Sequence, residues 1–231
     1  MSNYEKTILC LANSRKTSGR CIAGRERVKG GWGSWIRPVS KRGTREISEE
    51  ERRYENGQRA GVLDIVRIPM LKPQPEEFQL ENHLIDDDYY WLQEGFGDWA
   101  TIQELVEPID GPLWVNSHST FHGHNDKVPE DEARGLQHSL VLVAPTDLSI
   151  LVRRESGYQG QNKRRVRARF TLAGHGYCLQ VTDPVTEEAY LAKENGTYPI
   201  EDAILCISLA EVWNGFAFKL VATVLTQDMF E

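Results

Sequence analysis

The sequence has few cysteines, and none of them stand in a metal-binding or redox spacing. The four cysteines, Cys10, Cys21, Cys178 and Cys206, form no C-x-x-C pair, and three of them lie in apolar, strand-like runs. Cysteines of this kind are typical of buried thiols in a reducing compartment. The pattern argues against a metal or redox role for them.

Long hydrophobic runs are also missing. Near the N-terminus the only apolar run, Ile8 to Ala12, has five residues and an acidic residue ahead of it, which does not fit a signal peptide. No later run approaches the roughly 18 apolar residues that a membrane helix needs. We therefore expect a cytoplasmic protein that does not contact a membrane.

Catalytic motifs are absent as well. The sequence has no G-x-S-x-G, no H-E-x-x-H and no G-x-G-x-x-G after a predicted strand. The segment Gly19 to Glu26 has the glycine spacing of a P-loop, but Arg25 and Glu26 replace the lysine and hydroxyl residue that hold phosphate and magnesium. The sequence thus predicts no catalytic residue and no cofactor, and it leans away from an enzyme.

What is present is a globular composition with many short β-favourable runs. The chain has 231 residues, of which 40% are hydrophobic and 26% charged, enough for one large or two small domains. Helical signals are few, and the best is Trp99 to Glu107, with Asp98 as N-cap. The fold class predicted from these runs is mainly β with minor α, arranged as barrels or sandwiches. The expected strands are Thr7 to Ala12, Ser34 to Val39, Val62 to Ile68, Phe78 to Leu84, Ser139 to Val143, Leu148 to Arg153, Arg165 to Thr171, Tyr177 to Thr182, Ile204 to Leu209 and Phe216 to Leu225.

A polar, loop-like stretch between His118 and His138 has strand-rich sequence on both sides. It predicts a domain boundary there. Residues 1–118 would form an N-terminal barrel with a short added helix. Residues 119–231 would form a C-terminal barrel preceded by a polar loop.

Charge of one sign is absent from long parts of the chain. The net charge is −7, and residues 73–126 contain twelve acids but no lysine or arginine. Two other stretches, Arg15 to Arg45 and Arg153 to Arg169, hold 17 of the 27 basic residues and only two acids. Such segregation favours a local positive face on an acidic molecule, although a patchy solvated surface would have the same sequence.

The second basic stretch predicts a ladder of arginines. If residues 164–170 form a strand, Arg165, Arg167 and Arg169 share one face while Val166, Ala168 and Phe170 enter the core. The rungs would lie about 6.6 Å apart, which matches every second phosphate of a stacked strand with its ~3.4 Å repeat. The alternative is an edge strand guarded by charge against aggregation.

The first basic stretch interleaves arginines with tryptophans and glycines. Rings stack on any base while arginine contacts the backbone, so this combination is typical of a single-strand binding platform. We expect Trp32 to be exposed and Trp35, with Ile36, to lie nearer the interior. The candidate nucleic-acid-binding residues here are Arg15, Lys16, Arg20, Trp32 and Arg37.

Histidines gather in the polar stretch. His118, His122 and His124, with Asp126, have side chains suited to a divalent metal, but their spacing matches no recognised zinc motif. We expect solvated histidines in a loop and no metal site. The run Asp86 to Asp88 suits a solvated loop or a helix cap better than a nuclease centre, because three adjacent side chains cannot all converge on one ion.

Several segments resemble a known family, the bacterial dual-OB-domain-containing proteins. The resemblance is carried by ILCLANSRKTSGRCIAG, WIRPVS, LDIV, ENHLIDDDYYW, STFHGHNDKV, RRVRARFTLAGHGYCLQVTDP and FKLVATVL, which together span nearly the whole chain. It implies two OB-like barrels, a fold widely used to bind oligonucleotides and oligosaccharides. It implies no catalytic residues, and the histidine content of HSTFHGHND departs from the usual pattern.

Three functions remain open from the sequence. The first is a non-catalytic module that binds single-stranded DNA or RNA, or structured nucleic acid, through the arginine strand and the Trp/Arg segment. The second is a protein-interaction or sensor module of a multi-protein, possibly defence, system that docks through the acidic region 73–126. The third is a metal-dependent enzyme built on the histidine loop.

Overall fold

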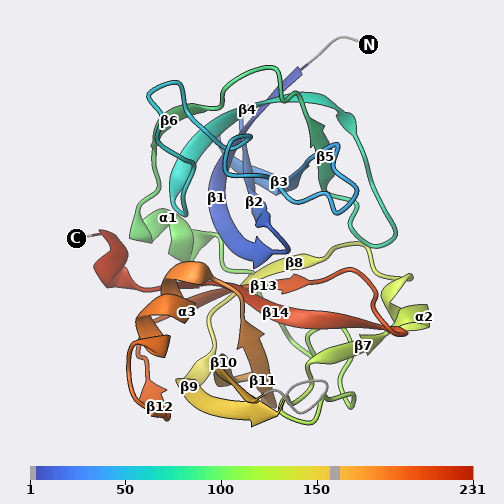
Figure 1. The fold of residues 1–231 in the computed structure, drawn as a ribbon, viewed down its shortest axis with the longest axis vertical. Helices are drawn as coiled ribbons and strands as arrows, with labels where there is room; N and C mark the ends of the chain where they lie inside the picture. Colours follow the sequence, from blue (N-terminus) through green and yellow to red (C-terminus); the bar gives the residue numbers. More distant parts are fainter. Residues whose placement is uncertain (1–3, 157–161, 231) are drawn as a thin grey trace. The chain divides into compact units, whose positions relative to one another are not determined.

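The computed structural model describes residues 4–156 and 162–230 (Figure 1). The chain forms two compact units, Met1–Leu105 and Val106–Glu231. This division lies ahead of the boundary expected after residue 118, because Leu113 already packs in the core of the second unit. Among the described residues, no helix has both the length and the apolar character needed to cross a bilayer.

The first unit is a barrel of five strands with a sixth strand added. Its sheet has the order β1-β2-β3-β5-β4-β6, and β1 also pairs with β4, which closes the ring. The strands β3 and β5 run parallel, whereas the other neighbours are antiparallel. This is the strand order of an OB fold. The elements are β1 (Tyr4–Lys16), β2 (Gly19–Val28), β3 (Gly31–Val39), β4 (Asp64–Pro73), β5 (Asn82–Ile85), β6 (Leu92–Phe96) and α1 (Trp99–Glu104).

Closure of the first barrel depends on the strong curvature of β1, which borders β2 and β4 in turn (Figure 1). The register of β1 against β2 shifts between Cys10 and Ala12, and a bulge of this kind bends a strand. At Gly24 a side chain would collide with the backbone of Leu9. Only glycine therefore lets β2 approach β1 at the bend.

The second unit repeats the arrangement with different additions. Its sheet has the order β12-β9-β10-β11-β14-β13-β8, with β7 paired to β14. The meander β9-β10-β11 and the parallel pair β11 and β14 again follow the OB order. The elements are β7 (Lys127–Pro129), α2 (Glu130–Ala133), β8 (Leu140–Val143), β9 (Thr146–Ser156), β10 (Asn162–Leu172), β11 (His175–Val181), α3 (Pro184–Leu191), β12 (Gly196–Pro199), β13 (Ile204–Leu209), β14 (Phe216–Leu225) and a 3-10 turn, Gln227–Phe230.

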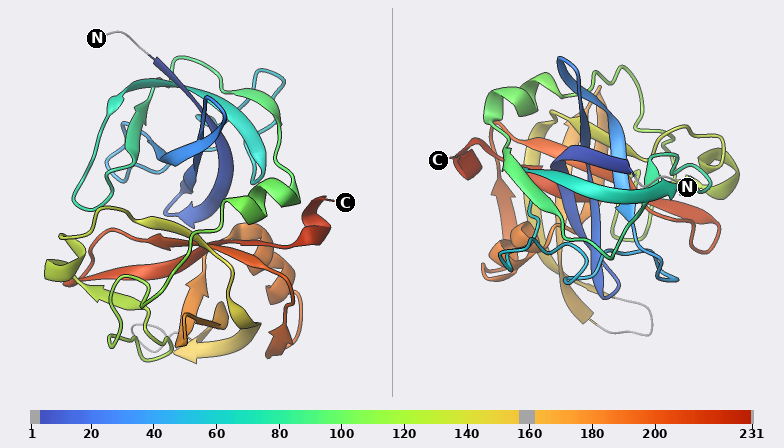
Figure 2. Two further views of the ribbon diagram at one scale, coloured as in Figure 1. Left: turned by 180° about the vertical axis from the view of Figure 1, so that it is seen from behind. Right: turned by 90° about the horizontal axis from the view of Figure 1, so that it is seen from above.

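The core of the second unit follows the two-residue period of its strands. Val166, Ala168 and Phe170 of β10 are buried, and the Phe170 ring stacks on Tyr177 of β11 with centroids 5.3 Å apart. The helix α3 lies between β11 and β13 in the chain and packs beside β9 and β10 (Figure 2). Arg164 donates hydrogen bonds to Leu191 O at the end of the helix and to Lys193 O two residues beyond it, which fixes this end of the helix to the sheet.

The predicted fold class, two OB-like barrels in tandem, is confirmed. Each expected strand overlaps an observed one, and the Asp98 side chain caps α1 at Thr101 N as predicted, although the helix ends at Glu104. The strand β2 was missed because its glycines and charges are typical of a loop. The helix α3 was missed although its signals are present, since Asp183 caps it and Pro184 begins it.

Candidate functional site

The arginine ladder on β10 is the first predicted feature to test. By alternation Arg165, Arg167 and Arg169 do share the outer face of the strand, opposite the buried Val166, Ala168 and Phe170. Arg165 is half-buried and Arg169 exposed, but Arg167 is only 7% exposed. The expectation that all three arginines face solvent is therefore wrong for Arg167.

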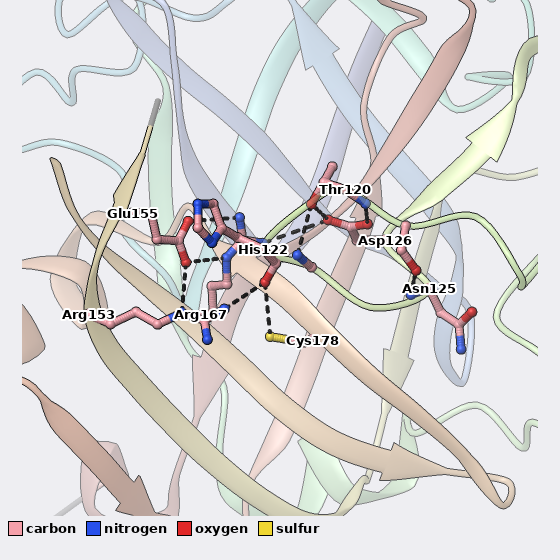
Figure 3. Close-up of polar contacts among 10 residues, drawn as sticks. Thr120, His122, Asn125, Asp126, Arg153, Glu155, Arg167 and Cys178 are labelled. Atoms are coloured by element: carbon pink, nitrogen blue, oxygen red, sulfur yellow. Dashed lines mark hydrogen bonds and ion pairs between the residues drawn. The ribbon is translucent and has the colours of Figure 1, made fainter. Parts of the chain in front are cut away.

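Arg167 is held in a buried ion-pair cluster (Figure 3). Its Nε and Nη2 donate to the two carboxylate oxygens of Glu155 at 2.7 and 3.0 Å, and its Nη1 lies 3.7 Å from Asp126 Oδ2. Arg153 also reaches Glu155, at 3.1 Å. Because its N–H donors are engaged in this bidentate pair, the buried Arg167 guanidinium is not available to a phosphate.

The cluster sets the charge of Glu155. Burial alone would raise the pKa of this carboxyl, but the hydrogen bonds and positive charge of Arg167, helped by Arg153, lower it below its ordinary value. Glu155 therefore stays ionised and keeps the arginines in place.

What covers Arg167 is residues 117–126, which we call the strap. His124 and Cys178 exchange backbone hydrogen bonds of 3.1 and 3.0 Å, so the strap is tied to the edge of β11. The Asn125 amide donates to Gly176 O at 2.9 Å, and Arg153 donates to His122 O at 2.7 Å. Asp126 closes the strap on itself by accepting from the Thr120 backbone and hydroxyl. The polar stretch is thus an ordered cover on one part of the β10–β11 face.

The three histidines of this region point to different partners. His122 Nε2 lies 3.2 Å from Ser156 Oγ, His124 Nε2 lies 3.4 Å from the Asn125 amide, and the His118 ring packs against Phe216. Within residues 4–156 and 162–230, no three His, Cys, Asp or Glu side chains are grouped to hold a metal ion. The metal-enzyme hypothesis gains no support from this arrangement.

A hollow of about 440 Å³ lies beside the strap on the same outer face of unit two. Its lining includes Lys163 and Arg165 from β10, Gln180 from β11, Phe121 from the strap and Trp213 from the turn between β13 and β14. Nothing in the described part of the chain forms an ion pair with Lys163 or Arg165. The lining of the hollow therefore includes two cations without an ion-pair partner among the described residues and two aromatic side chains.

The basic residues of 153–169 thus divide into two groups. Arg153, Arg164 and Arg167 support the structure through the contacts above. Arg154, Lys163, Arg165 and Arg169 have no ion-pair partner among the described residues. Of these, Arg169 lines a separate hollow of about 970 Å³ whose other walls carry Asp147, Glu201 and Asp202, so its surroundings are less favourable to an anion.

The predicted nucleic-acid-binding residues of the first unit are more fully engaged in contacts within the protein. Arg15 and Lys16 end β1 opposite Arg20 and Gly19, which brings the first three basic residues together. Arg20 Nε lies 3.4 Å from Glu49. Arg37 is 4% exposed and pairs with Glu81 at 3.0 Å, so a binding role for Arg37 is not compatible with its position.

The tryptophans of this unit lie under arginines. Trp35 is buried, as expected, with the Arg25 guanidinium 5.5 Å from its ring centroid. Trp32 is half-buried rather than exposed, and Arg27 lies 5.4 Å above it. These internal cation–π contacts occupy faces that a base would need.

Acids of the segment 73–105 neutralise much of the first basic stretch. Besides Glu81, the residues Glu76, Asp87 and Glu94 pair with Arg45, Lys41 and Arg27. The segregation of charge along the sequence is thus largely cancelled inside this unit. The candidate site residues that sequence reasoning missed, Phe121, Lys163, Gln180 and Trp213, line a hollow of the second unit. The signal available in the sequence was a single aromatic residue, Phe121, within a polar stretch.

The comparisons agree with the fold. The family model of the dual OB-containing domain matches residues 6–224 of this chain. A search of curated proteins and a search of solved structures found no match. Since the match spans both barrels, the chain belongs to the dual OB-containing domain family.

Proposed function

We propose that the second barrel binds single-stranded nucleic acid on the outer face of β10 and β11. OB folds bind oligonucleotides on the face of their second and third strands and with the loops that follow the first and fourth. Here those strands are β10 and β11, and the loop after the fourth strand carries Trp213. The observation that carries the proposal is that uncommitted Lys163 and Arg165 lie at this very place, beside exposed rings.

The charge of the site favours the phosphate backbone of a nucleic acid as the ligand over a protein. Two cations on one strand, two residues apart, are spaced about 6.6 Å, close to alternate phosphates of a stacked single strand. The strap covers part of this face and leaves the hollow beside it open, which suits a single strand better than a duplex. The loop between β9 and β10, residues 157–161, lies outside the described residues.

The test is a matched pair of variants. Replacing Lys163 and Arg165 together by Ala should weaken binding to labelled single-stranded DNA and RNA at low salt, because both contacts to phosphate are lost. Arg154→Ala is the control: it removes an exposed arginine, which has no ion-pair partner among the described residues, from the opposite face of the neighbouring strand, and it should leave affinity unchanged.

If Arg154→Ala, which removes one charge, loses half as much binding free energy as the double variant, which removes two, then only overall charge matters and the proposed face is wrong. If the unchanged protein binds neither DNA nor RNA at low salt, the nucleic-acid function fails. The protein-docking alternative would then rest on Tyr89, Tyr90, Leu92 and Phe96, which are exposed on and beside the edge strand β6 in the acidic region.

A further inference from the structure

We infer that Phe121 and Trp213 form a stacking site for unpaired bases, so that the second barrel recognises bases and not phosphate charge alone. This inference rests on the proposed function and deepens it. It names the ligand as a base-bearing single strand, in contrast to a general polyanion.

Exposure is the first reason. Phe121 is 92% exposed and Trp213 is 63% exposed. Single exposed aromatic residues are common and carry no meaning alone, whereas exposed rings that gather at one place mark an interaction site. These two are not scattered, because both line the hollow that also holds Lys163 and Arg165.

Each ring also has one aromatic neighbour among the described residues. Phe121 meets the His122 ring edge-on at 4.8 Å, and His122 is fixed by Ser156. Trp213 is tilted against Phe218 at 6.2 Å, and its backbone closes the turn through hydrogen bonds with Phe216. The rings are thus partly oriented before any ligand arrives, which reduces the entropy lost on stacking.

The size and polarity of the hollow agree with a base. A volume of about 440 Å³ lies within the usual range for small-ligand sites, roughly 300–1,000 Å³. Gln180 adds a carboxamide for which no hydrogen bond is found among the described residues, and such a group can donate to and accept from a base edge. Aromatic faces beside backbone-binding cations are the combination that single-strand binders use.

The experiment compares two labelled oligonucleotides of equal length, one with bases and one fully abasic, by fluorescence anisotropy at low salt. Both carry the same phosphates, so a difference in affinity reports the bases. The unchanged protein should bind the base-bearing strand more tightly. Phe121→Leu and Trp213→Leu should each lose roughly 5- to 150-fold of that affinity, as expected for one stacked base, with affinity for the abasic strand retained.

Tyr89→Leu is the matched control, because it removes an aromatic ring of similar exposure, 61%, from the first unit. It should change neither affinity. A free mononucleotide should compete only weakly, because a single phosphate cannot engage both cations.

The inference is overturned if the unchanged protein binds both strands equally, while the backbone-binding proposal then still stands. It is equally overturned if the two ring variants bind the base-bearing strand as the unchanged protein does, or lose the abasic strand to the same extent. If neither strand binds at all, the proposed function and this inference are both wrong.

Discussion

At the residue scale, neighbouring arginines on one strand have different roles. Arg165 and Arg167 share a face of β10, yet Arg167 is bound to Glu155 and Asp126 while Arg165 has no ion-pair partner among the described residues. The difference comes from what lies over each position. The Arg167 guanidinium lies beneath the strap and is held in ion pairs, whereas the Arg165 guanidinium lies beside the strap and remains available to a ligand.

Arg167→Ala should therefore lower stability. It leaves the carboxylates of Glu155 and Asp126 buried and short of a cation, and breaking a buried pair costs about 3–5 kcal/mol. Arg165→Ala, on the same face, should change the free energy of unfolding by no more than about 0.5 kcal/mol. Urea titrations of both variants measure this. Unchanged stability in Arg167→Ala, together with lost nucleic-acid binding, would return Arg167 to the binding site.

At the element scale, the position of the strap also depends on the residues just ahead of it in the chain. Lys219 of β14 is 1% exposed and donates to Val115 O at 2.5 Å and Asn116 Oδ1 at 3.1 Å, just ahead of the strap. Asn116 also donates to the Tyr177 hydroxyl. Burial lowers the pKa of Lys219 to about 7, although the charge of Asp126 acts in the other direction.

This pKa predicts a pH dependence that Lys219→Met should remove. Between pH 7 and about 10, the unfolded chain holds the lysine proton and the folded chain does not, so unfolding takes up a proton. Stability of the unchanged protein should then rise relative to the variant from pH 7 to 9, by at most about 1.4 kcal/mol per pH unit. Below pH 7 the difference should be constant. Denaturant unfolding at pH 6, 7 and 9 measures it, and a difference that does not vary with pH would contradict the low pKa.

At the scale of the whole molecule, a net charge of −7 opposes any polyanion and leaves binding to a local site. If Lys163 and Arg165 each meet one phosphate, the slope of log K against log salt on single strands should be about −1.4, since each contact contributes about 0.7. The double alanine variant should bring the slope close to zero. A residual slope would indicate that other basic residues also contact the phosphates.

The sequence by itself predicted ten of the strands, and its resemblance to a known family predicted the OB-like barrels. The period-two pattern placed Val166, Ala168 and Phe170 inward, because alternation depends only on local backbone geometry. Glycine-rich β2 was missed, since its use as a strand depends on the close approach of β1 at Gly24.

Only the tertiary structure decided which basic residues are available. Alternation assigns a side chain to a face, but it cannot say what packs on that face. Asp126 reaches Arg167, and Glu81 reaches Arg37, across long separations in the chain. The hollow with Phe121, Lys163, Arg165 and Trp213 is assembled from the strap, a strand and a distant turn. Such contacts arise from long-range packing, for which the local pattern of residues carries no signal.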